Sequence, residues 1–281
     1  MNSRIKILLG LLVLIVLAWA VIIYRDYFTG ETNQTTSHKP GTADEDVAGE
    51  NYTSPQREAE VSKSMALLKG WAAGERVDEE AVRRFGLEKC FQSEEINDRL
   101  FQRINGKTFV EGGHIRRGDL RHLKVLHVDV EGHTFIGEMI CHRMIADKLT
   151  EIFRKLYEAR YPIEQMLLPD VYGADDERQM QKNNSSCFCD RTVQNSRTLS
   201  KHALGLAVDI NPRYNPYVVP HRDGSVEISP ANGKSYVDRT RNFDYKIEKN
   251  DLCYQLFTSN GFQWGGNWSS RKDYQHFEFK P

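Results

Sequence analysis

The segment Ser200-Lys201-His202-Ala203-Leu204-Gly205-Leu206-Ala207-Val208-Asp209-Ile210 combines a histidine, a turn glycine and an apolar run that carries one carboxylate. The run Leu206–Ile210 is typical of a buried strand, and Asn211-Pro212 predicts its end. Asp209 follows His202 by seven residues. A carboxylate in such a strand needs a partner, because burial of an unpaired charge is costly. A metal ion shared with His202 would supply that partner.

A second segment, Asp273-Tyr274-Gln275-His276-Phe277-Glu278, supplies further ligand types near the end of the sequence. The alternation predicts a strand over His276–Phe279, with His276 and Glu278 on one face. Asp273 is expected in the turn before this strand, close to the metal without ligating it. His202, Asp209 and His276 then form the donor set of a catalytic zinc site, with an open position for water.

The competing interpretation is structural, because a histidine taken alone is more often structural than a ligand and the chain has nine. The run His127-Val128-Asp129-Val130-Glu131 also alternates. It is interpreted as the polar side of an edge strand, with a metal-binding face as the alternative. The prediction of a zinc site therefore depends on the combined pattern of the two segments.

The combined pattern Ser-x-His-x-x-Gly-x-Ala-x-Asp, followed by Asp-x-x-His-Phe-Glu, resembles the zinc D-alanyl-D-alanine carboxypeptidase family. That family includes VanY-like carboxypeptidases, D,D-dipeptidases and L-alanyl-D-glutamate endopeptidases, and it shares its fold with the hedgehog signalling domain. The local match covers residues 200–209 and 264–278, and a looser match extends over about 87–281. The resemblance implies an α+β, hedgehog/DD-peptidase-like fold, in which a small antiparallel sheet holds the zinc site and helices pack on it.

The resemblance also implies roles for individual residues. His202, Asp209 and His276 bind one Zn²⁺, and Asp273 is the general base. An arginine upstream of the first histidine holds the substrate carbonyl oxygen, and its candidates are Arg191 first, then Arg178 and Arg197. Ser200 is expected to hydrogen-bond the substrate. Trp264 and Trp268 either line the groove or are core residues, and Trp268 is the predicted substrate contact.

The implied function is a zinc metallopeptidase that hydrolyses peptidoglycan stem peptides, of the D-alanyl-D-alanine carboxypeptidase type, with zinc-bound water activated by Asp273. Within the family, an L-alanyl-D-glutamate endopeptidase or a D,D-dipeptidase is the alternative. The alternative of another class is a non-catalytic zinc-binding interaction module. Asp273 favours the enzyme, because a binding module has no need of a base there.

The run Ile7–Tyr24 has 18 residues without a charge, or roughly 27 Å as a helix, against a hydrocarbon core of about 30 Å. Arg4 and Lys6 precede it, which favours a cytoplasmic N-terminus. These features predict a single-pass membrane anchor with the catalytic domain on the exported side of the cell membrane. A signal peptide cleaved after Ala20, giving a secreted protein, is the alternative.

The predicted organisation is an anchor over 1–28, a flexible linker over 29–60, a short helical lead-in over 61–86 and a zinc peptidase domain over 87–281. Within that domain, Lys124–Val130 is predicted as a strand and Ile136–Tyr157 as a helix. The five cysteines are interpreted as structural or incidental. Lysine plus arginine is 38 and aspartate plus glutamate is 39, so nothing in the charge supports a nucleic-acid partner.

Overall fold

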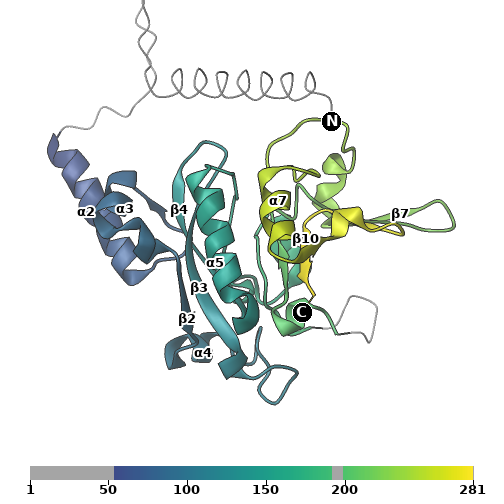
Figure 1. The fold of residues 1–281 in the computed structure, drawn as a ribbon, viewed down its shortest axis with the longest axis horizontal. Coiled ribbons are helices and arrows are strands. Elements are labelled where there is room, and N and C mark those ends of the chain that lie inside the picture. The colour runs from purple at the N-terminus through teal and green to yellow at the C-terminus, as the bar shows by residue number, and fades with distance from the viewer. Residues whose placement is uncertain (1–53, 192–198, 281) are drawn as a thin grey trace, which may run out of the picture. The chain divides into compact units, whose positions relative to one another are not determined.

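Three antiparallel sheets and the helices between them make up the described residues, 54–191 and 199–280, of the computed structural model (Figure 1). This mixture of helices and antiparallel sheets is the α+β class that the sequence predicts. The helices are α2 (Ser54–Gly70), α3 (Glu79–Phe85), α4 (Asp98–Ile104), α5 (Arg143–Glu158), α6 (Asp176–Gln181) and α7 (Leu252–Ser259).

The largest sheet has the strand order β1-β4-β3-β2. Its strands are β1 (Arg76–Val77), β2 (Gln92–Glu95), β3 (Leu120–Val128) and β4 (Thr134–His142). Helix α5 packs against it and buries Leu149, Ile152 and Phe153 in the main hydrophobic core. The ring of Phe153 meets the ring of Phe257 on α7 at 6.3 Å, so α5 joins this sheet to the part of the chain that carries the site.

The predicted helix over Ile136–Tyr157 is wrong in its first part, because residues up to His142 form β4 and only then does α5 begin. Strand β4 pairs with β3 over its whole length, for example Leu126 with Ile136. Apolar residues are buried on both of its faces, which removes the alternation that marks a half-buried strand. The His142 side chain accepts a hydrogen bond from the Met144 amide and caps the helix.

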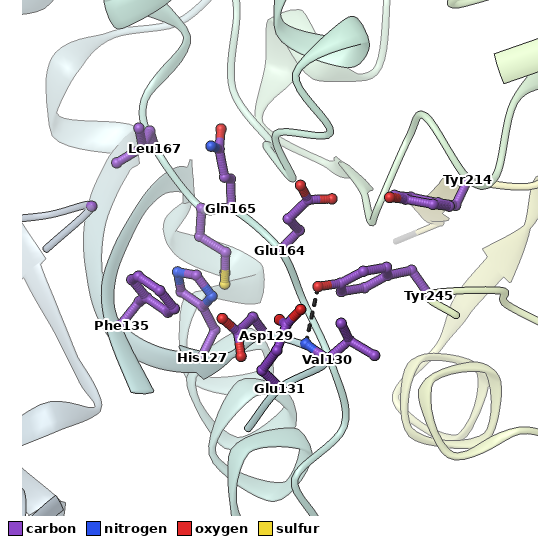
Figure 2. Close-up of a pocket in the computed structure, with 12 residues that line it drawn as sticks. His127, Asp129, Val130, Glu131, Phe135, Glu164, Gln165, Leu167, Tyr214 and Tyr245 are labelled. Atoms are coloured by element: carbon purple, nitrogen blue, oxygen red, sulfur yellow. Dashed lines mark hydrogen bonds between the residues drawn. The ribbon is translucent and has the colours of Figure 1, made fainter. Parts of the chain in front are cut away.

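The predicted strand over Lys124–Val130 is displaced, because β3 already ends at Val128 and Asp129 begins the turn. The Asp129 carboxylate accepts a hydrogen bond from the His133 amide at 2.7 Å, which closes the hairpin. His127 does not lie on an edge strand, since β3 has β4 and β2 on its two sides and His127 is only 4% exposed. His127 lines a cavity of about 370 Å³, and Asp129 and Glu131 lie in the same wall (Figure 2).

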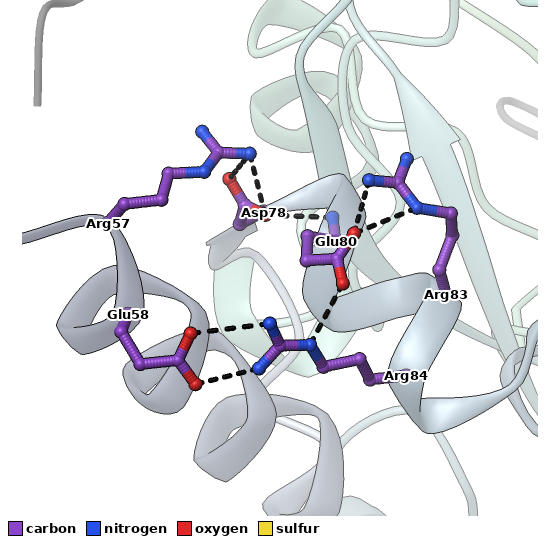
Figure 3. Close-up of polar contacts among 6 residues, drawn as sticks. All are labelled: Arg57, Glu58, Asp78, Glu80, Arg83 and Arg84. Carbon is purple, nitrogen blue, oxygen red and sulfur yellow. Dashed lines mark hydrogen bonds and ion pairs between the residues drawn. The ribbon is translucent and has the colours of Figure 1, made fainter. Parts of the chain in front are cut away.

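Helix α2 begins at Ser54, inside the range 29–60 predicted as linker. Its first turns are polar in sequence but are held by ion pairs with the following segment (Figure 3). Glu58 pairs with Arg84 at 2.7 Å, and Arg57 pairs with Asp78 at 3.2 Å. The predicted lead-in 61–86 packs into the main core through Val61 and Leu68, so it is part of the same compact unit as the residues that follow.

Among residues 54–191 and 199–280, no helix has the length and apolar character needed to cross a membrane. The predicted anchor Ile7–Tyr24 and most of the predicted linker lie outside the described residues.

Two smaller sheets carry the candidate site. One has the order β5-β10-β8 and the other the order β7-β6-β9. Their strands are β5 (Ala207–Asp209), β6 (Tyr217–Pro220), β7 (Val226–Ser229), β8 (Phe262–Trp264), β9 (Lys272–Asp273) and β10 (His276–Phe279). The strands predicted around Asp209 and at His276–Phe279 are thus confirmed. Phe277 of β10 stacks on Phe257 of α7 at 4.4 Å, which places α7 on the β5-β10-β8 sheet.

Candidate metal centre and substrate cavity

The pairing of β5 with β10 places two of the predicted zinc ligands side by side. The strands are antiparallel, and His276 lies directly opposite Asp209 in the register. His202 comes from the helical turn just before β5. That turn ends at Gly205, whose φ is +63° and where a Cβ would lie 2.6 Å from the His142 amide nitrogen. Glycine at this position therefore allows the turn to pack on the end of β4.

Donor atoms of all three predicted ligands converge on one point. His202 Nε2 lies 3.2 Å from both His276 Nδ1 and Asp209 Oδ2, and His276 Nδ1 lies 3.1 Å from Asp209 Oδ1. All three residues are buried. The three ligand atoms lie within 4.8 Å of one another, which is close enough to hold a single metal ion.

The outer nitrogens of both rings are engaged elsewhere. His202 Nδ1 donates to the Cys187 carbonyl at 2.6 Å, and His276 Nε2 lies 3.6 Å from Glu278 Oε2. With a metal ion bound, these contacts would favour ring protons on the outer nitrogens and leave the lone pairs of the inner nitrogens facing the centre. The Cys187 thiol is buried and takes no part in this donor set.

The meeting of two imidazole nitrogens and a carboxylate calls for positive charge at the centre, either as ring protons or as a metal ion. Burial alone would lower the pKa of His276, but its contacts with Asp209 and Glu278 outweigh burial and raise that pKa to about 10. Burial likewise acts to raise the pKa of Asp209, yet the two histidines hold it well below its usual range. Two imidazole nitrogens and one carboxylate oxygen fit the ligand preferences of Zn²⁺.

Asp273 lies beside this centre on β9. Its Oδ1 is buried and has no hydrogen-bond partner among the described residues. Burial, with a smaller contribution from the charge of Asp209, raises the pKa of Asp273 to about 7 although the two histidines oppose the shift. A carboxylate with this pKa and a free oxygen is suited to exchange protons with water near neutral pH.

The motif Trp264-Gly265-Gly266-Asn267-Trp268 supports Asp273 from behind. A Cβ at Gly265 would lie 2.6 Å from the Asp273 carbonyl oxygen, so the two backbones touch. Trp264 is a buried core residue whose indole nitrogen donates to the Tyr274 carbonyl. Trp268 is half-buried instead, and its ring lies 5.4 Å from the ring of His276.

The predicted arginine, Arg191, reaches the same region from the segment that follows Cys189. One of its terminal nitrogens pairs with Asp176 at 2.8 Å, and its Nε is buried without a hydrogen-bond partner among the described residues. Of the two competitors, Arg178 lies on α6 and is absent from the cavity wall, and Arg197 lies outside the described residues. Ser200 is buried, and its hydroxyl accepts a hydrogen bond from the His202 amide.

A cavity of about 450 Å³ brings the predicted residues together. Its wall includes every one of the seven predicted site residues: Arg191, Ser200, His202, Asp209, Trp268, Asp273 and His276. The cavity contains both the polar centre and the aromatic ring of Trp268. This combination is usual in small-ligand and peptide sites.

Residues 194–279 match a family model described as D-alanyl-D-alanine carboxypeptidase.

The matched region contains the three metal-binding candidates, Asp273, Ser200 and Trp268, whereas Arg191 precedes it. The match supports a relationship to the zinc D-alanyl-D-alanine carboxypeptidases, and so to peptidases of peptidoglycan. No curated protein and no solved structure matches the chain.

Asp176, Tyr217 and Arg271 are among the cavity-wall residues that sequence analysis did not assign to the site. Tyr217 reaches the site because β6 pairs with β9, which places it opposite Asp273 in the register. No local sequence pattern predicts a pairing between segments so far apart in the chain. Arg271 could have been predicted from the sequence, because it lies between the two site motifs, three residues after Trp268 and two before Asp273.

Proposed function

We propose that this chain is a zinc peptidase that hydrolyses stem peptides of peptidoglycan, of the D-alanyl-D-alanine carboxypeptidase type. The observation that carries the proposal is the arrangement of the inner nitrogens of His202 and His276 with Asp209, next to the unpartnered oxygen of Asp273. A metal-binding module needs the first three residues alone. A buried carboxylate oxygen without a hydrogen-bond partner among the described residues is costly for the fold, and the use of Asp273 as a base would explain it.

His202, Asp209 and His276 would hold the metal. When bound, Zn²⁺ supplies Lewis-acid polarisation of the scissile carbonyl and lowers the pKa of water. Asp273 takes the proton from the attacking water and then gives it to the departing amine. Without a metal ion the pKa of Asp273 is about 7, and the positive charge of bound Zn²⁺ would lower it, which favours the base form at neutral pH.

Arg191 is proposed to stabilise the negative charge that develops on the carbonyl oxygen. The ion pair with Asp176 fixes one end of its guanidinium, and its Nε has no hydrogen-bond partner among the described residues. Ser200 orients the His202 turn through the amide of His202, and its contact with substrate is a further proposal.

The proposed location is the exported face of the cell membrane, with Ile7–Tyr24 as a single-pass anchor. The apolar length of that segment and the basic residues before it support this placement. The peptidase would then lie on the side of the membrane where peptidoglycan is found.

The test is the incubation of the purified, zinc-loaded full chain with defined muropeptides, followed by mass spectrometry of the products. Loss of a terminal D-alanine identifies a carboxypeptidase, and cleavage between L-alanine and D-glutamate identifies an endopeptidase. The variant Asp273→Ala is the matched control. Cleavage that survives this substitution contradicts the role of Asp273, and a wild-type chain that cleaves no muropeptide contradicts the proposed function.

A further inference from the structure

Three cations line the substrate cavity, and their surroundings differ. Arg191 forms an ion pair with Asp176 at 2.8 Å. Lys201 lies near Glu278, whose pKa it helps to lower. Arg271 forms no ion pair with a carboxylate among residues 54–191 and 199–280, although its guanidinium belongs to the cavity wall. Among the described residues neither Lys201 nor Arg271 forms an ion pair, so Arg191 is the one of these three cations whose charge a carboxylate neutralises directly.

Arg271 is nevertheless held in place by two aromatic residues. Its guanidinium carbon lies 5.3 Å from the centroid of the Trp268 ring, within the range of a cation–π contact. It also lies near the hydroxyl of Tyr217, where its positive charge opposes the rise that burial causes in the pKa of that tyrosine. A planar guanidinium supported in this way keeps donors free for a further partner.

Both aromatic residues lie next to a residue of the proposed reaction centre. The Trp268 ring lies 5.4 Å from the ring of His276, a predicted metal ligand. Tyr217 lies opposite Asp273, the proposed base, in the β6–β9 register. Arg271 thus contacts a side chain that itself contacts His276, and lies near a tyrosine that faces Asp273 in the sheet.

We propose that Arg271 determines specificity by binding a free carboxylate on the residue that leaves with the amine. This proposal rests on the proposed function. Guanidinium and carboxylate form paired, charge-assisted hydrogen bonds, which makes arginine suited to this task. Glu227, a further carboxylate of the cavity wall, forms its ion pair with His221 at 3.4 Å.

The chemistry of the two candidate bonds points to the same ligand group. In a D-alanyl-D-alanine end, the leaving residue carries its carboxylate on the carbon that bears the released amine. In an L-alanyl-D-glutamate bond whose glutamate continues the stem through its γ-carboxyl, the α-carboxylate occupies the same position. The inferred substrate class is therefore a peptide whose leaving D-residue has a free α-carboxylate, and amidation of that group would remove the contact.

The test compares paired substrates that differ only at this carboxylate, as the free acid and as the primary amide, for whichever bond the chain cleaves. Wild type is expected to prefer the acid by about tenfold to hundredfold in kcat/KM, the usual value of a charge-assisted hydrogen bond. Arg271→Met is expected to lose that preference, because cleavage of the acid slows, mainly through KM, far more than cleavage of the amide does. Arg271→Lys should keep part of the preference for the acid over the amide.

Arg222→Met removes one exposed positive charge from the β6–β7 loop, outside the cavity wall, and should keep the full preference. Zinc affinity and melting temperature of Arg271→Met report whether the cavity survives the change. Equal cleavage of acid and amide by wild type, or an unchanged preference in Arg271→Met, overturns the proposal for Arg271 and leaves the proposed function standing. Absence of cleavage of both substrates overturns the proposed function, and the proposal for Arg271 with it.

Discussion

Asp209 and His276 face each other across the β5–β10 pair, with His276 Nδ1 3.1 Å from Asp209 Oδ1. The backbone register fixes this proximity, so it does not depend on a flexible loop. His202 completes the centre from a turn that Gly205 allows to pack against the end of β4. Rigid strands and a tight turn are the supports expected of a preorganised metal centre.

The first prediction concerns Glu278, which contacts the outer nitrogen of His276 at 3.6 Å. Glu278→Gln weakens the contact that holds the ring proton on the outer nitrogen. Zinc affinity should therefore fall by about tenfold to hundredfold, as is usual for the loss of such a partner. Competition with a chelator measures this zinc affinity. Glu227→Gln, which changes another carboxylate of the same cavity, is the matched control and should bind zinc as wild type does.

The second prediction concerns Asp273. Asp273→Asn keeps the size of the side chain but removes the base, so cleavage should fall by about a hundredfold or more while zinc is still bound. Burial raises the pKa of Asp273 to about 7, which disfavours its charged form in the fold. In the metal-free protein at pH 8, Asp273→Asn should therefore raise the melting temperature. A lower melting temperature would show that the charge of Asp273 stabilises the fold.

The acid side of the pH profile gives a third prediction. Asp273 acts as a base only when deprotonated, so kcat/KM should rise with pH. The bound cation lowers the pKa of Asp273, and the midpoint of the rise is expected below about 7 but above the usual range of an aspartate. Measurement of kcat/KM between pH 4 and pH 8 gives the midpoint. A profile that is flat across this range argues against Asp273 as the base.

A fourth prediction uses the contact between Gly265 and Asp273. Gly265→Ala places a Cβ 2.6 Å from the Asp273 carbonyl oxygen, so β9 must move. Cleavage should fall by at least about tenfold, since small displacements of catalytic groups are costly. Gly118→Ala is the matched control, because nothing lies within 4 Å of the added Cβ. Equal activity of the two variants would contradict the proposed role of the Gly-Gly motif.

A fifth prediction concerns stability away from the site. Burial lowers the pKa of His127 to about 4, and its Nδ1 donates to the Ile163 carbonyl. Above pH 6.5 the ring is neutral in both folded and unfolded chains. The stabilisation that the buried neutral ring gives to the fold is then fully present. As pH falls from 6.5 to 4, the unfolded chain takes up a proton and up to about 3 kcal/mol of stability is lost. In His127→Gln, the free energy of unfolding measured with urea should depend less on pH between 6.5 and 4.

The sequence was informative where chemistry and local pattern coincide. The apolar run around Asp209 and the alternation of His276–Phe279 each predict a strand, and the polar residues on those strands were the candidate ligands. The same logic failed at Ile136, because a strand buried on both faces loses its alternation. It also failed at Tyr217, which reaches Asp273 only through the β6–β9 pairing. Such a pairing depends on packing between distant segments, which spacing alone does not encode.

The most direct test of the central claim is mass spectrometry of one defined muropeptide mixture after incubation with three forms of the full chain. These forms are the zinc-loaded protein, the protein stripped by a chelator, and the stripped protein with zinc restored. The account predicts cleavage of one stem-peptide bond by the first and third forms, and none by the second. Cleavage at an equal rate by the stripped protein, in which zinc is undetectable, would contradict the role of the His202–Asp209–His276 centre.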